Sequence, residues 1–222
     1  MLIGIISDVH GNEVALKAAL DEMPETDLIL LAGDIAGRAV ELKKIFDIID
    51  ENKVVYIKGN HEDMAVLYFN NFGKDEVTRR LVERINDTPC SMELSIDGKK
   101  IFMAHGSPWN TKSEYIYPEY HDFKAFETLG YKYIILGHTH VPMVVKSGDV
   151  TIINPGSVGE PQAHDPRPSF ALLDTEAERA EIRYVKNYLE EKKLRFITPF
   201  RWKSYDVRLF TKAGGNKVVE TS

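Results

Sequence analysis

Five short apolar runs in this sequence each lead into residues that can bind a metal ion. These residues are Asp8, His10, Asp34, Asn60, His61, His105, His138 and His140. Imidazole, carboxylate and amide groups together suit divalent ions such as Mn, Fe, Co, Ni or Zn. One His beside an Asp is ordinarily a structural hydrogen-bonded pair. Here five of the seven histidines follow apolar runs, and this clustering favours a metal site.

The candidate ligands are too many for one tetrahedral ion. Without His61 they are Asp8, His10, Asp34, Asn60, His105, His138 and His140. A site with two ions about 3.5–4 Å apart accounts for them better, and Asp34, alone at its strand end, is the expected bridge. Alternate side chains of an extended segment point the same way. We therefore expect Asp8 and His10 to aim together, and His138 and His140 likewise.

The apolar runs must be the elements that position these residues. They cover residues 2–6, 28–32, 54–57, 101–104 and 134–136. Because they are unbroken by polar residues, they are typical of strands buried on both faces. Helical spacing of apolar residues predicts helices around 16–23, 42–49, 77–85 and 120–129, with Asn12 as the N-cap of the first.

The second half of the chain has a different pattern. Asp97-Gly98 and Gly148-Asp149 each separate two apolar segments, which predicts two hairpins. Residues 169–174 and 181–185 add two further strands. The sequence therefore predicts an α/β fold with one mixed sheet or two sheets. Ligands of open α/β sheets bind beyond the carboxyl ends of strands, where the candidate metal ligands lie.

Composition limits the class of protein. The chain has 222 residues, 43% of them hydrophobic and 28% charged, which is typical of a globular protein. The single cysteine, Cys90, excludes a disulfide scaffold and a zinc site of the finger or ribbon kind, which needs several cysteines. No apolar run approaches the ~20 residues of a membrane span, and the first run is too short for a signal peptide. We expect a soluble, cytoplasmic protein.

Charge is distributed unevenly along the chain. Residues 1–182 carry 18 basic and 30 acidic side chains, whereas residues 183–222 carry 10 and 4. We predict a catalytic domain over 1–185 and a basic extension over 186–222. The extension either packs on the acidic body, contacts a phosphate-bearing substrate or partner, or contributes to a homo-oligomer. The acidic body makes nucleic acid an unfavourable partner, since such binding depends on many Lys and Arg contacts with phosphate.

Taken in order, these motifs resemble those of the calcineurin-like metallophosphoesterases. The matching motifs are Asp8-x-His10, Gly33-Asp34, Gly59-Asn60-His61-Glu62, His105-Gly106 and Gly137-His138-x-His140. Residues 154–159 resemble the loop that follows in the compact prokaryotic phosphodiesterase branch. The resemblance spans residues 1 to about 185. It implies a double mixed-sheet sandwich flanked by helices, in four α/β/β/α layers.

The resemblance also implies roles for the candidate residues. One ion would be held by Asp8, His10, Asp34 and His140, and the other by Asp34, Asn60, His105 and His138. Mn is the expected metal, with Ni, Fe, Co, Zn and Mg as alternatives. A hydroxide bridging the two ions would attack phosphorus, and His61 would act catalytically, giving a proton to the leaving group.

The sequence departs from the pattern of many protein phosphatases at Gly37, where those enzymes carry an Asp that orients the catalytic His. His61 therefore needs another orienting group, such as Glu62 or a backbone carbonyl. Arg38 stands where an Arg contacts phosphate in those enzymes, and the alternative is a solvated Arg. Arg167 has the same two interpretations.

Together these features predict a metal-dependent phosphodiesterase that acts on a small phosphate ester or nucleotide. The alternatives are a phosphomonoesterase, a nucleotide pyrophosphatase or a nuclease. A non-catalytic protein-binding scaffold is a further alternative, although no ligand position is degenerate. Aromatic residues after His105 could stack on a base or pack in the core; they are Trp109, Tyr115, Tyr117 and Tyr120.

Overall fold

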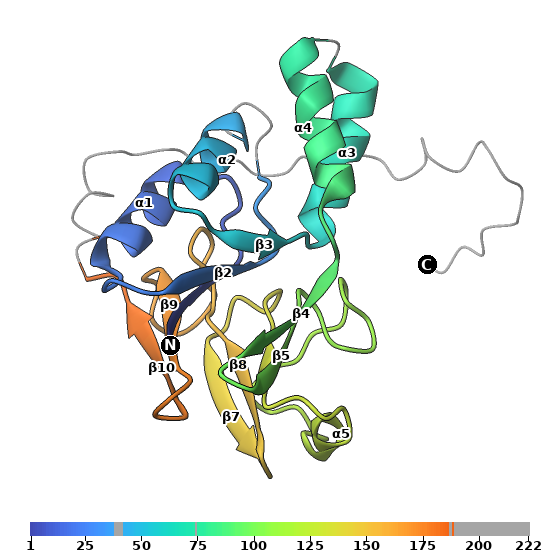
Figure 1. Ribbon diagram of the computed structural model, residues 1–222. Helices are drawn as coiled ribbons and strands as arrows, with labels where there is room; N and C mark the ends of the chain where they lie inside the picture. The colour runs from blue at the N-terminus through green and yellow to red at the C-terminus, as the bar shows by residue number, and fades with distance from the viewer. Residues whose placement is uncertain (38–41, 74, 187, 189–222) are drawn as a thin grey trace, which may run out of the picture.

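The computed structural model describes residues 1–37, 42–73, 75–186 and 188, and contains two five-stranded sheets (Figure 1). The first sheet has the order β10-β9-β1-β2-β3. Its strands are β1 (Leu2–Ile6), β2 (Leu28–Ala32), β3 (Val55–Ile57), β9 (Ser169–Asp174) and β10 (Arg179–Tyr184). β1, β2 and β3 are parallel, whereas β9 runs antiparallel to β1 and to β10. The carboxyl ends of β1, β2 and β3 therefore meet at one edge.

The second sheet has the order β4-β5-β6-β8-β7. Its strands are β4 (Ser91–Ile96), β5 (Lys99–Ala104), β6 (Tyr133–Ile135), β7 (Met143–Ser147) and β8 (Val150–Asn154). The predicted hairpins are β4–β5 and β7–β8, and both are confirmed. At the first turn Asp97 and Gly98 have φ values of 50° and 72°, which a two-residue hairpin needs.

Helices cover the outer face of the first sheet and extend beyond its edge (Figure 1). They are α1 (Glu13–Glu22), α2 (Leu42–Glu51), α3 (Asn60–Phe72) and α4 (Glu76–Asp87), and a short α5 (Lys124–Glu127) lies by the second sheet. α1 begins as predicted, because the side chain of Asn12 accepts a hydrogen bond from the N–H of Ala15 at 3.1 Å.

Two helical segments differ from the sequence-based expectation. α3 was not predicted, because Met64, Leu67, Tyr68 and Phe72 are exposed and do not show the period of a buried face. The helix expected over 120–129 is reduced to the four residues of α5. The aromatic residues around α5 instead pack from a loop onto the second sheet, with Phe126 fully buried.

Three apolar cores separate the layers. Alternate residues of β1 serve two of them: Ile6 packs beneath α1 and α2, whereas Ile3 and Ile5 pack between the sheets. A third core, which includes Ile116 and Phe126, lies on the outer face of the second sheet. The predicted double-sheet sandwich flanked by helices is confirmed, although loop segments make up most of the outermost layer on the second sheet.

The start of the predicted extension packs on the domain. Tyr188, in the predicted extension, is buried in the core beneath the helices beside Val185, the last residue of the predicted domain. The Tyr188 hydroxyl is 3.0 Å from the Asn12 side-chain amide. Residues 189–222, on which the predicted contacts of the basic extension depend, lie outside the described residues. Within the described part of the chain, no helix has the length and apolar character needed to cross a bilayer.

Candidate metal centre

The carboxyl ends of strands from both sheets supply one cluster of carboxylates and imidazoles. Among the residues that the structure describes, three groups of side chains place their possible ligand atoms within 4.8 Å of one another. The groups are Asp8, His10 and His140; His10, Asp34 and His61; and Asp34, His105 and His138. Because His10 and Asp34 each belong to two groups, the three groups form a single centre between the sheet ends.

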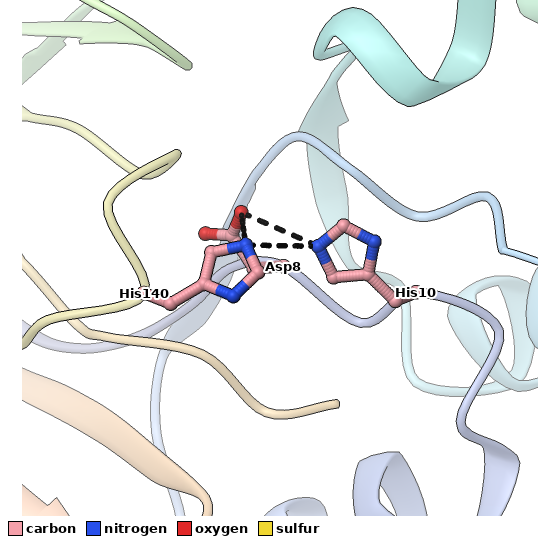
Figure 2. A group of neighbouring side chains, drawn as sticks. All are labelled: Asp8, His10 and His140. Atoms are coloured by element: carbon pink, nitrogen blue, oxygen red, sulfur yellow. Dashed lines mark hydrogen bonds and ion pairs between the residues drawn. The ribbon is translucent and has the colours of Figure 1, made fainter. Parts of the chain in front are cut away.

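The first group aims three atoms at one point (Figure 2). Asp8 Oδ1 lies 3.2 Å from His140 Nε2 and 3.7 Å from His10 Nε2. The two Nε2 atoms are 3.0 Å apart. Two imidazole nitrogens and one carboxylate oxygen that converge in this way suit a divalent transition metal.

The group of Asp34, His105 and His138 is centred on the other carboxylate. Asp34 Oδ2 lies 3.1 Å from His105 Nε2 and 3.8 Å from His10 Nε2. The rings of His105 and His138 are 4.9 Å apart. Asp34 therefore faces His10 on one side and His105 on the other, which is the position expected for a shared carboxylate.

Several polar atoms at the centre are buried without a hydrogen-bond partner. They are Asp8 Oδ1, Asn60 Oδ1, His105 Nε2 and His138 Nε2. Nearly all buried polar groups in proteins are hydrogen-bonded, so such a concentration needs a physical reason. Each of these atoms is a good ligand for a divalent ion, and bound metal ions would satisfy all four. The residues present therefore fit a metal centre.

Two of the histidines at the centre are held in place through their Nδ1 atoms. His105 Nδ1 lies 2.8 Å from the Ala32 carbonyl and His140 Nδ1 lies 2.6 Å from the Glu160 carbonyl. A proton on Nδ1 can donate to each carbonyl, which leaves the Nε2 lone pair for a metal.

The carboxylates are anchored in a corresponding way. Asp34 Oδ1 accepts from the His61 N–H at 2.9 Å, and Asp8 Oδ2 accepts from the His138 N–H at 3.1 Å. In each carboxylate, one oxygen is fixed by the backbone and the other faces the centre.

The sequence predicts an extended backbone at the centre, but the backbone there is not extended. Asp8, His10, Asp34, His138 and His140 all have positive φ, between 48° and 67°. The premise of alternating side chains along an extended segment is therefore wrong, although both pairs of residues reach the centre. Such conformations cost about 1–3 kcal/mol each and persist where the surroundings enforce them. Here the backbone does so in part, because the N–H of His10 donates to the Asp34 carbonyl at 3.0 Å.

Glu62 supports the centre from behind. Its buried carboxylate accepts N–H hydrogen bonds from Ala36 and Gly59 at 2.6 Å and from Asp34 at 3.1 Å. Both carboxylate oxygens accept backbone N–H groups, so Glu62 positions the Asp34 loop. Burial, together with the charge of Asp34, raises the pKa of Glu62 to about 7.

The loop of residues 154–159 ties the two sheet ends together. The Asn154 side-chain amide donates to the Gly137 carbonyl at 2.6 Å, beside the turn that carries His138. The Ser157 hydroxyl donates to the Asp8 carbonyl at 2.8 Å. One loop therefore braces the backbone of ligand candidates on both sheets. The sequence signalled this loop only through its resemblance to the family.

The two carboxylates keep the centre anionic. Burial opposes ionisation of Asp8, but the nearby imidazoles of His10, His105 and His140 hold its pKa well below its usual range. Burial also disfavours a charge on His105, yet Asp34 and Asp8 raise its pKa to about 9. The pair of carboxylates therefore stabilises positive charge at the centre, whether as an imidazolium or as a bound cation.

His61 occupies the open side of the centre. It lies in the first turn of α3, its side chain is 30% exposed, and its Nε2 is 3.9 Å from Asp34 Oδ2. Its ring packs edge-on against His10 with centroids 4.4 Å apart. Burial lowers the pKa of His61, although the charge of Asp34 opposes this. Its exposure distinguishes it from the buried ligand candidates and leaves it accessible to a substrate.

The two predicted arginine contacts have different outcomes. Arg38 lies outside the described residues. Arg167 forms an ion pair with Asp165 at 2.6 Å, and its guanidinium lies over Tyr184 at 5.2 Å from the ring centroid. These contacts bind Arg167 to its own loop and to β10, and the predicted substrate contact stays a prediction.

Comparisons with known proteins agree with this arrangement. Residues 1–178 match the family model of the calcineurin-like phosphoesterase superfamily domain. The chain is 32% identical to the probable metallophosphoesterase MJ0623 of Methanocaldococcus jannaschii over 79% of this chain and 77% of that protein. It is 28% identical to a probable metallophosphoesterase of Methanothermobacter thermautotrophicus over 82% of this chain and 91% of that protein.

A solved structure is similar in fold and sequence. The metallophosphoesterase from Sphaerobacter thermophilus superposes with a TM-score of 0.69 and 28% identity, covering 84% of this chain and 88% of that one. The family match includes every residue of the cluster between the sheet ends, from Asp8 to His140.

Proposed function

This chain belongs to the calcineurin-like phosphoesterase superfamily and is a metal-dependent phosphoesterase, and we propose that it is a dinuclear phosphodiesterase. The observation that carries the proposal is the set of buried ligand atoms without hydrogen-bond partners between the sheet ends. Asp8, His10 and His140 would hold one ion, and Asn60, His105 and His138 the other. Asp34 would contact both ions.

The ions would provide the positive charge that an acidic chain needs to bind a phosphate ester. When bound, two divalent ions between two carboxylates leave a local charge of about +2, polarise phosphoryl oxygens and lower the pKa of water toward about 7. Asp8 and Asp34 fix the position of that charge through backbone N–H groups on their outer oxygens. The site would therefore attract a phosphate ester although the protein has a formal net charge of −6.

We propose that His61 donates a proton to the leaving group. Its ring is partly exposed at the open side of the centre and is positioned by the first turn of α3. Donation of a proton from His61 to the departing alkoxide oxygen would accelerate cleavage of esters with poor leaving groups by about 10²–10⁴.

The backbone at Gly37 argues against a phosphoprotein phosphatase. A Cβ atom at this position would lie 1.9 Å from the His10 carbonyl oxygen, so no side chain fits there. The orienting Asp that many protein phosphatases carry at the corresponding position therefore cannot be present in this backbone. We propose a small phosphodiester or nucleotide as substrate and Mn as the metal.

The test is hydrolysis of a chromogenic phosphodiester and of the matching monoester. Chelator-treated protein would be assayed with Mn²⁺, Ni²⁺, Fe²⁺, Co²⁺, Zn²⁺ or Mg²⁺ restored singly. We expect metal-dependent turnover with a higher kcat/KM for the diester. A higher kcat/KM for the monoester would assign the protein as a phosphatase. No turnover with any metal, while the ions are bound, would favour a binding scaffold.

A further inference from the structure

Two tyrosines beside the metal centre are exposed. They belong to the four aromatic residues for which the sequence allows either stacking on a base or packing in the core. Tyr115 and Tyr117 are 52% and 42% exposed, and their rings are nearly parallel, with an interplanar angle of 7° and centroids 5.9 Å apart. Trp109 is also 48% exposed, but its ring and that of Tyr120 pack edge-on against the buried ring of Phe126. The four aromatic residues therefore divide into a pair that packs on Phe126 and an exposed pair of tyrosines that stack on each other.

The exposed pair adjoins the metal centre directly. The ring of Tyr115 stacks on His138 with centroids 3.9 Å apart and an interplanar angle of 23°. His138 is a ligand candidate whose Nε2 is buried without a hydrogen-bond partner. An aromatic surface thus runs from a metal-ligand candidate outward through Tyr115 to Tyr117.

The loop that carries this surface is held in place. Ile116, between the two tyrosines, is 1% exposed and packs in the core outside the second sheet. The Ser107 hydroxyl donates to the Glu114 carboxylate and accepts from the Asn110 N–H. An inward-facing Ile flanked by two outward-facing tyrosines fixes both rings before any ligand binds, which reduces the entropy lost on binding.

Exposed, fixed aromatic rings bind ligands that have flat π-systems. Stacking of a nucleobase on an aromatic side chain is worth about 1–3 kcal/mol and tolerates any base. The body of the chain, with 18 basic and 30 acidic side chains in residues 1–182, disfavours a long polyanion. One nucleotide with its phosphate at the centre and its base on the rings satisfies both conditions.

We propose that Tyr115 and Tyr117 form a nucleobase-stacking subsite, so that the substrate is a nucleotide-type phosphodiester. This inference rests on the proposed function, since the phosphate is placed at the metal centre. The subsite selects the part of the substrate that carries the base, whereas His61 acts on the leaving oxygen.

The test compares two diesters with the same leaving group. One is the p-nitrophenyl ester of thymidine monophosphate and the other is methyl p-nitrophenyl phosphate, which has no base. The readout is the ratio of their kcat/KM values for the metal-loaded protein. We expect Tyr117→Leu and Tyr115→Leu each to lower this ratio by about 5-fold or more, and Tyr115→Phe to retain it. Tyr68→Leu, at a tyrosine that is 51% exposed on α3, is the matched control.

Other results would overturn the inference. An unchanged ratio in both Leu variants would exclude base stacking. If Tyr115→Leu also lost metal, as measured by elemental analysis, its ring would serve only to position His138. If the wild type hydrolysed neither diester, the proposed function would fail. Calorimetric titration of the metal-loaded protein with thymidine monophosphate and inorganic phosphate would still decide the inference, because equal Kd values would contradict it.

Discussion

The two sheet ends contribute different chemistry to the same centre. The first sheet supplies both carboxylates, Asp8 and Asp34, on loops after β1 and β2. The second sheet supplies imidazoles alone, from His105, His138 and His140. The first sheet end also supplies His10 and Asn60, whereas the second sheet end contributes no carboxylate to the described cluster. The comparison shows that the centre depends on how the two sheets face each other and not on one continuous motif.

The two ends are also anchored differently. On the first sheet, carboxylate oxygens accept backbone N–H bonds, and Glu62 fixes the Asp34 loop through three further N–H groups. On the second sheet, ring nitrogens of His105 and His140 bind backbone carbonyls. The first sheet therefore fixes negative charge, and the second sheet fixes lone pairs. Substitutions at the two ends should have distinguishable effects.

The largest effect is expected at the carboxylate that faces both groups. Asp34→Asn removes the charge nearest to His105 Nε2, 3.1 Å away. Because ligation and polarisation by the ions are worth several kcal/mol, we expect kcat to fall by about 10³-fold or more. Elemental analysis should show that metal is lost with activity. Full retention of both ions would contradict a shared role for Asp34.

A slightly smaller and more selective effect is expected at His61. His61→Ala should retain the ions, because the buried ligand candidates remain, but reduce kcat by about 10²–10⁴ for diesters with poor leaving groups. The loss should be small for p-nitrophenyl esters, whose leaving group needs no proton. Equal losses on the two kinds of ester would exclude proton donation by His61.

A third prediction concerns the close packing behind the first-sheet carboxylates. In Gly59→Ala the new Cβ atom would lie 2.2 Å from Asp34 Oδ1. We expect a destabilisation of about 1–3 kcal/mol in denaturant unfolding, together with weaker metal binding. Gly98→Ala is the control: nothing lies within 4 Å of its Cβ, but its φ is 72°. It should cost about 1 kcal/mol and leave metal binding intact.

The smallest effect is expected away from both sheet ends. Arg84 binds both carboxylate oxygens of Asp50, at 2.6 and 2.7 Å, and this lowers the pKa of Asp50. The pair therefore stabilises the fold above the ordinary Asp pKa, and its contribution is lost as the pH falls through the lowered value. Since Asp50 is largely exposed, Asp50→Asn should cost only about 0.5–1 kcal/mol at pH 7.

The check for this last variant is urea unfolding at two pH values. The difference between wild type and Asp50→Asn should shrink below about pH 3. Metal content and activity at pH 7 should match those of the wild type. A loss of metal would mean that the sheet ends are not independent of the helical face.

The sequence predicted the strands and the residues at their ends more fully than it predicted the helices. Unbroken apolar runs such as those of β1 and β2 are typical of doubly buried strands, and both bounds were predicted correctly. α3 escaped prediction because exposed Leu67 and Phe72 obscure its period. Its first residues were recognised as site residues, but the helix itself was not.

The contacts that complete the centre were beyond a single sequence. The hydrogen bond from Ser157 to the Asp8 carbonyl joins residues 149 positions apart, and the stack of Tyr115 on His138 depends on the path of a loop. The positive φ values of residues such as Asp34 have no signal of their own, because only the neighbouring glycine hints at a sharp turn. Chemistry was therefore visible in residue types, whereas positioning depended on the tertiary fold.

The most direct test of the central claim is anomalous diffraction from crystals loaded with Mn²⁺. We predict two peaks about 3.5–4 Å apart. One should contact Asp8, His10 and His140, the other should contact Asn60, His105 and His138, and Asp34 should contact both. A single peak, or a peak on one sheet end alone, would contradict a dinuclear centre assembled from the two sheets.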